Sequence, residues 1–391
     1  MEKVSRRHCE IIEYTRSHKP VTRPLLAERL SASLPTISVA VRELLESEIL
    51  VEDGYLKSSG GRRASLLELN PDFLHSLGLS VGMSGVRGVI ADLSGRVIKE
   101  RSLYFEVAPT RQDVLDALVG MTGFLLDGAE RIPEGIGCGI SGLVRQRDGV
   151  SIRFPYIDDW RDVPVAAILK EHFGLDAFVE NDVNACTLAE LRFGAGRGLH
   201  NFLYAFIGRG IGLGIVVGGD LYRGAGGNAG ELGHIALCSD GLLCQCGNYG
   251  CLETVAGPES VVSQVRKAIE SGAVSSIETG PGGEVAFMSV LEAAEAGDRL
   301  AENVVSRAAE HLGSALANMA NLFDPEVIIL GGLLANASDR ILDTLRRVFD
   351  SGVLPSIAPD IELVVSRLGE VSGALGAAEV VFQNRLSALG S

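Results

Sequence analysis

The chain has 391 residues and a formal net charge of −15, with 46% hydrophobic and 22% charged residues. At this length we expect two or three domains rather than a single core. The first residues are basic without an apolar segment, and no apolar run approaches the roughly 18 residues that cross a bilayer. We therefore expect neither a signal peptide nor membrane binding, but a cytoplasmic protein whose thiols stay reduced.

Charge is distributed unevenly along the chain. Residues 1–70 contain 11 Lys and Arg and 10 Asp and Glu, whereas the remaining residues contain 24 and 40. The larger part is therefore acidic, and an acidic surface repels the phosphates of nucleic acid. Only the first segment is compatible with binding a polyanion.

Three helical patterns precede residue 50, at about residues 6–18, 22–33 and 33–50. Apolar residues recur at helical spacing in each pattern, and Thr22 stands where a helix N-cap is expected. A short polar turn, SASLPT, separates the second pattern from the third. This arrangement is typical of a helix–turn–helix, whose later helix enters the major groove of DNA.

The segment after these helices predicts two short strands around a glycine-containing loop, as in the wing of a winged helix–turn–helix. Hydroxyl groups contact phosphates or bases, and arginine binds guanine or phosphate. The candidate DNA-contacting residues are Pro35, Thr36, Ser38 and Arg42 on the third helix and Arg62 and Arg63 in the loop. A small helical dimerisation domain with a solvated Arg–Arg loop stays open as the alternative.

From about residue 75 the pattern changes to strands punctuated by glycine, which alternate with amphipathic helices. We expect consecutive antiparallel strands between residues 77 and 105, and long helices near residues 258–270, 287–296 and 299–322. Two halves of βββαβα type indicate a duplicated α/β architecture.

Five ordered motifs in this part of the chain resemble the ROK family of repressors, open reading frames and sugar kinases. The motifs are SVGMSGVRGVIADLSG, ENDVNAC, GRGIGLGIVVGGDLYRGAGGNAGELGH, CQCGNYGCLET and DPEVIILGGLL. The resemblance implies a duplicated actin-like, hexokinase-type ATPase fold of class α/β, preceded by a small winged helix–turn–helix domain. The expected domains are residues 1–72 and 73–391, the second with lobes at roughly 73–185 and 186–391.

A cluster of cysteines matches the zinc motif of the family. The matching residues are His234, Cys244, Cys246 and Cys251, spaced H-x9-C-x-C-x4-C in a knuckle at residues 234–251. Three thiolates and one imidazole suit tetrahedral Zn²⁺ and leave no open position for water, so the resemblance implies a structural zinc ion. We leave Cys238 outside the set. A disulfide is the alternative, and a reducing compartment argues against it.

The resemblance also implies a sugar pocket, because carboxylates, amides and imidazoles bind the hydroxyl groups of a sugar. The matching residues are Asn181, Asp182, Glu231, His234 and Glu253, with Gly142 allowing the backbone to approach the ring. In family kinases the counterpart of Asp182 is the general base, which would be vestigial here. Tyr156 stands where the family often has asparagine, so the identity of the sugar stays open.

The phosphate-binding loops depart from the family pattern. Family kinases resemble one another in a D-x-G-x-T loop and a G-T-G-x-G loop. The counterparts here are Ser80, Gly82 and Ser84 in the first loop and Gly208, Arg209 and Gly210 in the second. Without the aspartate that works with Mg²⁺, phosphoryl transfer should slow by several orders of magnitude, so we expect neither ATP–Mg²⁺ as cofactor nor catalysis. The glycines are equally explained by the tight turns of the fold.

The sequence thus predicts a DNA-binding regulator, a repressor released from a double-stranded operator by a sugar or sugar-phosphate effector. The alternative is an ATP-dependent hexose kinase with an appended DNA-binding domain, and activation rather than repression is a third hypothesis. Inverted operators need paired readers, so we expect a homodimer, or a tetramer.

Overall fold

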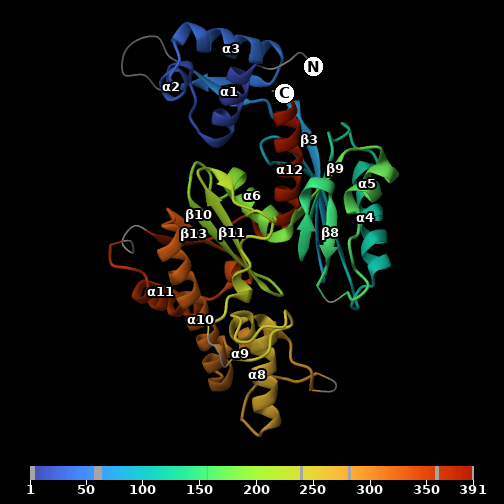
Figure 1. Ribbon diagram of the computed structural model, residues 1–391, viewed down its shortest axis with the longest axis vertical. Coiled ribbons are helices and arrows are strands. Elements are labelled where there is room, and N and C mark those ends of the chain that lie inside the picture. The colour runs from blue at the N-terminus through green and yellow to red at the C-terminus, as the bar shows by residue number, and fades with distance from the viewer. Residues whose placement is uncertain are drawn as a thin grey trace. The chain divides into compact units, whose positions relative to one another are not determined.

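The computed structural model describes residues 5–56, 64–155, 157–237, 241–280, 283–356 and 361–389 (Figure 1). The chain forms two compact units. Unit 1 comprises Met1–Gly198 and Glu370–Ser391, and unit 2 comprises Leu199–Gly369. Among the helices of the described ranges, none is both long and apolar enough to span a membrane.

The first residues of unit 1 form three helices and a two-stranded sheet. These elements are α1 (Arg6–Ser17), α2 (Arg23–Arg29), α3 (Leu34–Glu46), β1 (Leu50–Tyr55) and β2 (Ser65–Leu69). Thr22 caps α2, its Oγ1 accepting a hydrogen bond from the Leu25 amide at 3.4 Å, and Ser33 caps α3 by accepting from the Thr36 amide at 3.3 Å. The three helices lie where the sequence predicts them, so that prediction is confirmed. The two strands pair antiparallel and complete a winged helix–turn–helix.

The core of this winged domain extends beyond its own residues. Ile11, Ile37 and Leu44 are buried together on the facing sides of the helices. Phe382 and Leu386 of the last helix, α12 (Ser372–Leu389), belong to the same apolar cluster. The end of the chain therefore completes the core of its beginning.

The rest of unit 1 is built on a mixed sheet with helices packed against it. The strands are β3 (His75–Gly82), β4 (Gly85–Asp92), β5 (Val97–Tyr104), β6 (Ile136–Ile140) and β9 (Ala177–Asn181), in the order β5-β4-β3-β6-β9. Three strands form an antiparallel meander, and β3, β6 and β9 run parallel. The helices are α4 (Arg111–Leu126), α5 (Val165–Phe173), α6 (Asp182–Phe193) and α12, and β7 (Leu143–Arg145) and β8 (Val150–Arg153) form a small hairpin.

Unit 2 repeats this topology. Its strands are β10 (Phe202–Ile207), β11 (Ile211–Val217), β12 (Asp220–Leu221), β13 (Val327–Gly332) and β14 (Glu362–Val365), in the order β12-β11-β10-β13-β14. Three strands are again antiparallel and two further pairings are parallel. Its helices are α7 (Glu253–Ala256), α8 (Pro258–Glu270), α9 (Phe287–Glu295), α10 (Arg299–Phe323) and α11 (Asp339–Gly352). The duplicated α/β architecture is confirmed.

The division of the chain differs from the expected lobes at residues 73–185 and 186–391. That boundary falls inside α6, whereas the structure separates the units after Gly198 and returns α12 to unit 1. Close backbone packing explains why α12, at the end of the chain, belongs to unit 1. A Cβ on Gly137 of β6 would lie 1.8 Å from the Ala377 carbonyl oxygen, and one on Gly376 would lie 1.6 Å from that of Ala185 in α6. Only glycine permits these approaches.

Candidate functional site

The predicted DNA-contacting residues of α3 lie at its exposed start and along one face. Pro35 and Thr36 are exposed in the first turn, Ser38 is half-buried and Arg42 is exposed. Within the described ranges Arg42 has no acidic partner, so its guanidinium stays available for phosphate or guanine. Arg62 and Arg63 lie outside the described residues.

Two apolar residues of α3 belong to the same candidate surface and were missed from the sequence. Leu34 and Val39 expose 47% and 48% of their surface, respectively. Val39 precedes Arg42 by three positions, which places the two side chains on neighbouring parts of the helix. An exposed apolar group there is suited to the methyl group of thymine. The sequence could have revealed them, because Leu34 and Val39 do not follow the spacing of the apolar residues on the buried face of α3.

In unit 1, Asn181 ends β9 and caps α6. Its Oδ1 accepts hydrogen bonds from the amides of Val183 and Asn184 at 2.9 and 3.1 Å. Its Nδ2 donates to the Gly142 carbonyl and to Asp182 Oδ1, both at 3.0 Å. The amide is therefore fixed in one orientation and joins Gly142 to Asp182.

Asp182 begins α6 and is half-buried. Its Oδ2 accepts a hydrogen bond from Ser141 Oγ at 2.5 Å, and its Oδ1 accepts from the Val183 amide at 2.9 Å. Desolvation raises the pKa of Asp182 above its ordinary value, although these hydrogen bonds act in the opposite direction. A carboxyl group with a raised pKa is a stronger proton acceptor, which suits a partner for hydroxyl groups.

Glu180 directly precedes Asn181 and Asp182 and was not among the residues predicted from the sequence. Glu180 is buried, and its Oε1 accepts from the Asn181 amide at 3.0 Å, from Asn184 Nδ2 at 3.1 Å and from Gln146 Nε2. It thereby ties the end of β9 to the first turn of α6. Its place within the END motif was the signal that could have identified it.

Gly142 must be glycine for a local reason. Its φ of 94° is unfavourable for other residues, and a Cβ would lie 2.2 Å from the Arg153 carbonyl oxygen. Its own carbonyl accepts the hydrogen bond from Asn181. The glycine therefore serves the hairpin of β7 and β8 as well as the predicted sugar site. Tyr156 lies outside the described residues.

In unit 2, Glu253 connects the knuckle segment to the second glycine loop. Its Oε2 accepts a hydrogen bond from the Ile211 amide at 3.2 Å, and a Cβ on Gly210 would lie 2.6 Å from the same oxygen. Arg209 is half-exposed in this turn, and its Nε donates to Glu259 Oε1 of α8 at 2.8 Å. Arg209 thus has an acidic partner at the surface of the second glycine loop.

Glu231 and His234 lie together at a short 3-10 turn, Leu232–His234. Both are exposed, and the His234 amide donates to the Glu231 carbonyl at 3.0 Å. The Leu252 amide donates to the Ile235 carbonyl at 2.9 Å, which brings Glu253 back beside this turn. Unit 2 thus places its three predicted sugar ligands on one stretch of connected loop.

The knuckle residues converge as the sequence predicts. The ligand atoms of His234, Cys244, Cys246 and Cys251 all lie within 4.8 Å of one another. Cys246 Sγ is 3.7 Å from Cys251 Sγ, and Cys244 Sγ is 3.6 Å from His234 Nδ1. A tetrahedral ion with metal–sulfur bonds of about 2.3 Å keeps its sulfurs about 3.8 Å apart. Donor types and spacing therefore fit a four-coordinate metal site, and Cys238 lies outside the described residues.

The thiols of this cluster influence one another. Desolvation, assisted by the neighbouring Cys246 and Cys244, raises the pKa of Cys251 to about 12. The pKa of Cys246 is lowered, chiefly by a hydrogen bond from the Asn248 amide. Three adjacent sulfurs cannot all ionise without a compensating cation, which is the electrostatic role of a bound metal.

The first glycine loop lies at the tight turn between β3 and β4. Ser80 is half-buried in β3, Gly82 ends that strand, and Ser84 is exposed in the turn. Ser80 lies beside the first turn of α12, since a Cβ on Gly373 would be 2.5 Å from Ser80 Oγ. In the second loop, a Cβ on Gly208 would meet the Phe206 ring at 2.6 Å. The first glycine loop thus carries the hydroxyl groups of Ser80 and Ser84.

Comparisons with known proteins agree with this architecture. Residues 76–384 match the ROK family. The xylose repressor of Bacillus spizizenii strain W23 is 30% identical over 372 residues, which cover 94% of this chain and 93% of that protein. The crystal structure of a ROK family transcriptional regulator, a homologue of the E. coli MLC protein, has a TM-score of 0.81 at 28% identity and covers 98% of this chain and 97% of its own.

A kinase of the same fold matches a smaller share of the chain. The ROK family glucokinase from Streptomyces griseus, solved with glucose and AMPPNP, has a TM-score of 0.69 at 30% identity and covers 79% of this chain and 99% of its own. The two α/β units thus follow the hexokinase-type scaffold of sugar kinases, and a winged helix–turn–helix precedes them. The chain belongs to the ROK family.

Proposed function

We propose that this protein is a sugar-responsive transcriptional repressor, in which residues 1–72 bind operator DNA and residues 73–391 bind the sugar. The observation that carries the proposal is the similarity over nearly the whole chain to a ROK transcriptional regulator and a xylose repressor, the helix–turn–helix region included. Sugar and operator would weaken each other's binding by the same coupling free energy.

On the DNA side, we propose that α3 enters the major groove. Its exposed Pro35, Thr36 and Arg42 support this, together with the apolar surface of Leu34 and Val39. Arg62 and Arg63 are proposed contacts of the wing. A homodimer, or a tetramer of two dimers, would present two such helices to an inverted operator.

On the sugar side, Asn181 and Asp182 of unit 1 and Glu231, His234 and Glu253 of unit 2 are the proposed ligands. The fixed amide of Asn181 supports the assignment of Asp182, since it holds that carboxylate in one orientation by donating to its Oδ1. A hydroxyl group that binds Asn181 itself would replace one of its four present hydrogen bonds. A hydroxyl group can donate to Asp182 Oδ2, whose present donor is the Ser141 hydroxyl. The effector can be a free or a phosphorylated sugar, and both belong in the test.

The proposed metal is Zn²⁺, held by His234, Cys244, Cys246 and Cys251. Bound there, it supplies charge compensation for three thiolates and fixes the loop, without chemistry of its own. With Nδ1 of His234 directed at the cluster, Nε2 keeps its proton and is available as a hydrogen-bond donor. The knuckle thereby sets the orientation of a proposed sugar ligand.

We propose further that the protein does not phosphorylate its sugar. Ser80 cannot position Mg²⁺ as an aspartate does, and Arg209 is paired with Glu259. The competing hypothesis is an ATP-dependent hexose kinase with an appended DNA-binding domain. The glucokinase likeness and the retained Asp182 are the observations that favour it.

The test is a selection of fragments of the source genome on the full chain, followed by release of bound fragments with D-xylose, D-glucose and their phosphates. Discrete fragments released by one compound support the repressor and name its effector. Enrichment of no fragment, together with sugar-dependent ATP turnover, would overturn it in favour of the kinase.

A further inference from the structure

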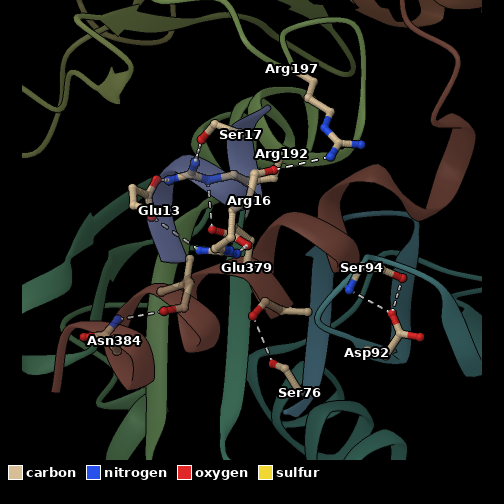
Figure 2. Close-up of polar contacts among 12 residues, drawn as sticks. Glu13, Arg16, Ser17, Ser76, Asp92, Ser94, Arg192, Arg197, Glu379 and Asn384 are labelled. Atoms are coloured by element: carbon tan, nitrogen blue, oxygen red, sulfur yellow. Dashed lines mark hydrogen bonds and ion pairs between the residues drawn. The ribbon is translucent and has the colours of Figure 1, made fainter. Parts of the chain in front are cut away.

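Helix α1 of the winged domain contacts the rest of unit 1 through a buried cluster of charged residues. Glu379 of α12 lies between two guanidinium groups, with Arg16 Nη2 at 2.5 Å from its Oε2 and Arg192 Nε at 3.3 Å from its Oε1 (Figure 2). Their side chains expose 3%, 0% and 8% of their surface for Arg16, Glu379 and Arg192. We refer to these three residues as the Arg–Glu–Arg cluster.

Arg192 also reaches the winged domain directly. Its Nη2 is 2.5 Å from Glu13 Oε1, and its Nη1 donates to Ser17 Oγ at 2.9 Å. Both partners lie on α1, so one guanidinium from α6 contacts α1 and α12 together (Figure 2). Desolvation acts to lower the pKa of Arg192, but Glu379 and Glu13 outweigh it and raise that pKa. Arg192 therefore stays charged.

Such a cluster is a device for specificity more than for stability. Burying charges has a large desolvation cost, which their attraction offsets only when the geometry is right. The cluster is satisfied only while α1, α6 and α12 keep this arrangement, because each helix contributes one of its three residues. A small displacement of α1 against α6 and α12 would leave the buried Arg16 without Glu379. The cluster therefore responds steeply to helix position.

Helix α6 joins this cluster to the proposed sugar ligands. Asn181 caps its first turn and Asp182 opens it, while Arg192 lies in its last turn. Ten residues separate Asp182 from Arg192, about 15 Å along a helix at its usual rise. A Cβ on Gly376 would lie 1.6 Å from the Ala185 carbonyl oxygen, so α6 and α12 are closely packed and would move together against α1. Phe382, three residues beyond Glu379, then enters the core of the winged domain.

We propose that Arg192 and Glu379 are positioning residues that hold the winged domain in the orientation needed for operator binding, and that sugar binding at Asn181 and Asp182 acts on them through α6. This inference rests on the proposed function and names the residues through which sugar binding would weaken operator binding. It requires that α6 and α12 together take two positions relative to α1, one of which separates Arg16 from Glu379 and Arg192 from Glu13.

The test compares Arg192→Gln with Arg145→Gln in the full chain. Arg192→Gln leaves Arg16 and Glu379 as a neutral buried pair, whereas Arg145 forms only exposed pairs with Asp148 and Asp162. Operator affinity is measured with and without the sugar found by the selection described above, D-xylose and D-glucose being tried first. Sugar affinity is measured by calorimetry, and folding by thermal melting.

In the unmodified chain we expect the sugar to weaken operator binding by a factor between about 5 and 150, the usual range for allosteric coupling. In Arg192→Gln that factor should fall below about 3, with sugar affinity within about twofold of the parent. Arg145→Gln should keep the full factor. Full release in a folded Arg192→Gln would overturn the inference while the proposed function stands. Absence of release from the unmodified chain would instead overturn the proposed function, and the inference with it.

A second variant decides the question if Arg192→Gln does not fold. The double change Glu13→Gln and Ser17→Ala removes the α1 partners of Arg192, together with the longer Glu13–Arg16 pair at 4.0 Å, and leaves the three residues of the Arg–Glu–Arg cluster in place. Glu13 is half-exposed, so the change creates no buried charge. We expect the release factor to fall at least threefold. An unchanged factor in this variant would overturn the inference by itself.

Discussion

The proposed sugar ligands of the two units are held in place by different means. In unit 1, Asn181 and Asp182 stand between a buried strand and a twelve-residue helix, and backbone groups and Glu180 fix them. In unit 2, Glu231, His234 and Glu253 lie on a loop with one 3-10 turn and a four-residue helix. The first set is positioned by the regular fold and the second by the cysteine knuckle.

This difference separates two ways of building the same kind of site. Residues on regular elements keep their geometry as long as the domain is folded, whereas a loop needs an additional constraint to hold side chains in place. The two sets should therefore respond to different perturbations. Loss of the metal should disable the ligands of unit 2, and loss of buried hydrogen bonds should disable those of unit 1.

The largest effect is expected from Cys246→Ser, which removes one of the four proposed metal ligands. We expect zinc content to be lost and sugar affinity to fall by about 100-fold, because the knuckle no longer orients His234. Operator binding without sugar should change by less than about threefold, since the winged domain belongs to the other unit. Elemental analysis, calorimetry and operator titration measure these quantities. Cys9→Ser is the matched control, and a Cys246→Ser variant with full zinc and full sugar response would show the assignment to be wrong.

The next effect concerns Asp182→Asn. We expect sugar affinity to fall by about 10- to 100-fold, since a hydrogen bond to a charged acceptor is lost. The folded protein should nevertheless become more stable near neutral pH, because desolvation raises the pKa of Asp182 and so disfavours its ionised form in the folded state.

The stability difference between the parent and Asp182→Asn should depend on pH. Below the unfolded pKa of about 3.9, Asp182 is neutral in both states and resembles asparagine. As the pH rises through the higher pKa of the folded state, the parent loses stability relative to the variant. Melting temperatures measured from pH 4 to pH 8 should therefore diverge with increasing pH. Parallel curves for the parent and Asp182→Asn would contradict the raised pKa.

A smaller effect is expected from Glu180→Ala, which leaves hydrogen-bond donors at the end of β9 without their acceptor. Three groups would lose their acceptor: the Asn181 amide, Asn184 Nδ2 and Gln146 Nε2. We expect a loss of about 2–4 kcal/mol in unfolding free energy and about tenfold in sugar affinity, because Asn181 is no longer held. Glu180→Gln keeps an acceptor oxygen and should restore most of both. Equal behaviour of the two variants in denaturant melts and sugar titrations would argue against a positioning role.

The sequence predicts the parts of both sites that lie within short motifs. The spacing H-x9-C-x-C-x4-C brings four ligand atoms together because the intervening turns are short, and Asn181 and Asp182 follow a strand directly. The three helices and the wing also follow from local patterns and caps. In each case the deciding contacts are close in sequence.

What the sequence does not predict depends on contacts between distant segments. Arg16 and Glu379 are 363 positions apart, and as charged residues both would be expected in solvent. Likewise Phe382 reads as a core residue of the second lobe, yet it packs in the winged domain. The register of α12 against the sheet determines where Glu379 and Phe382 lie. That register cannot be predicted from the residue type at a single position, because it depends on contacts between segments far apart in the sequence.

The smallest expected effect is a gain of catalysis by the double variant Ser80→Asp and Arg209→Thr. Ser80 Oγ lies next to Gly373 in the first turn of α12, and a carboxylate near a helix N-terminus is electrostatically favoured, so the aspartate should be accommodated. Replacement of Arg209 removes the pair with Glu259 from the second loop.

Because the family resemblance implies Asp182 as the base, we expect detectable sugar-dependent ATP turnover in the double variant. Its rate should be several orders of magnitude below that of an efficient kinase, since other positioning groups stay unoptimised. A coupled assay with Mg²⁺–ATP and D-glucose or D-xylose measures it, and adding Asp182→Asn to the double variant should abolish it. If the unmodified chain already turns over ATP in a sugar-dependent manner, the two loops are functional and unit 1 binds its sugar for chemistry. If neither protein does, the departure from the kinases extends beyond Ser80 and Arg209, and the retained Asp182 serves recognition alone.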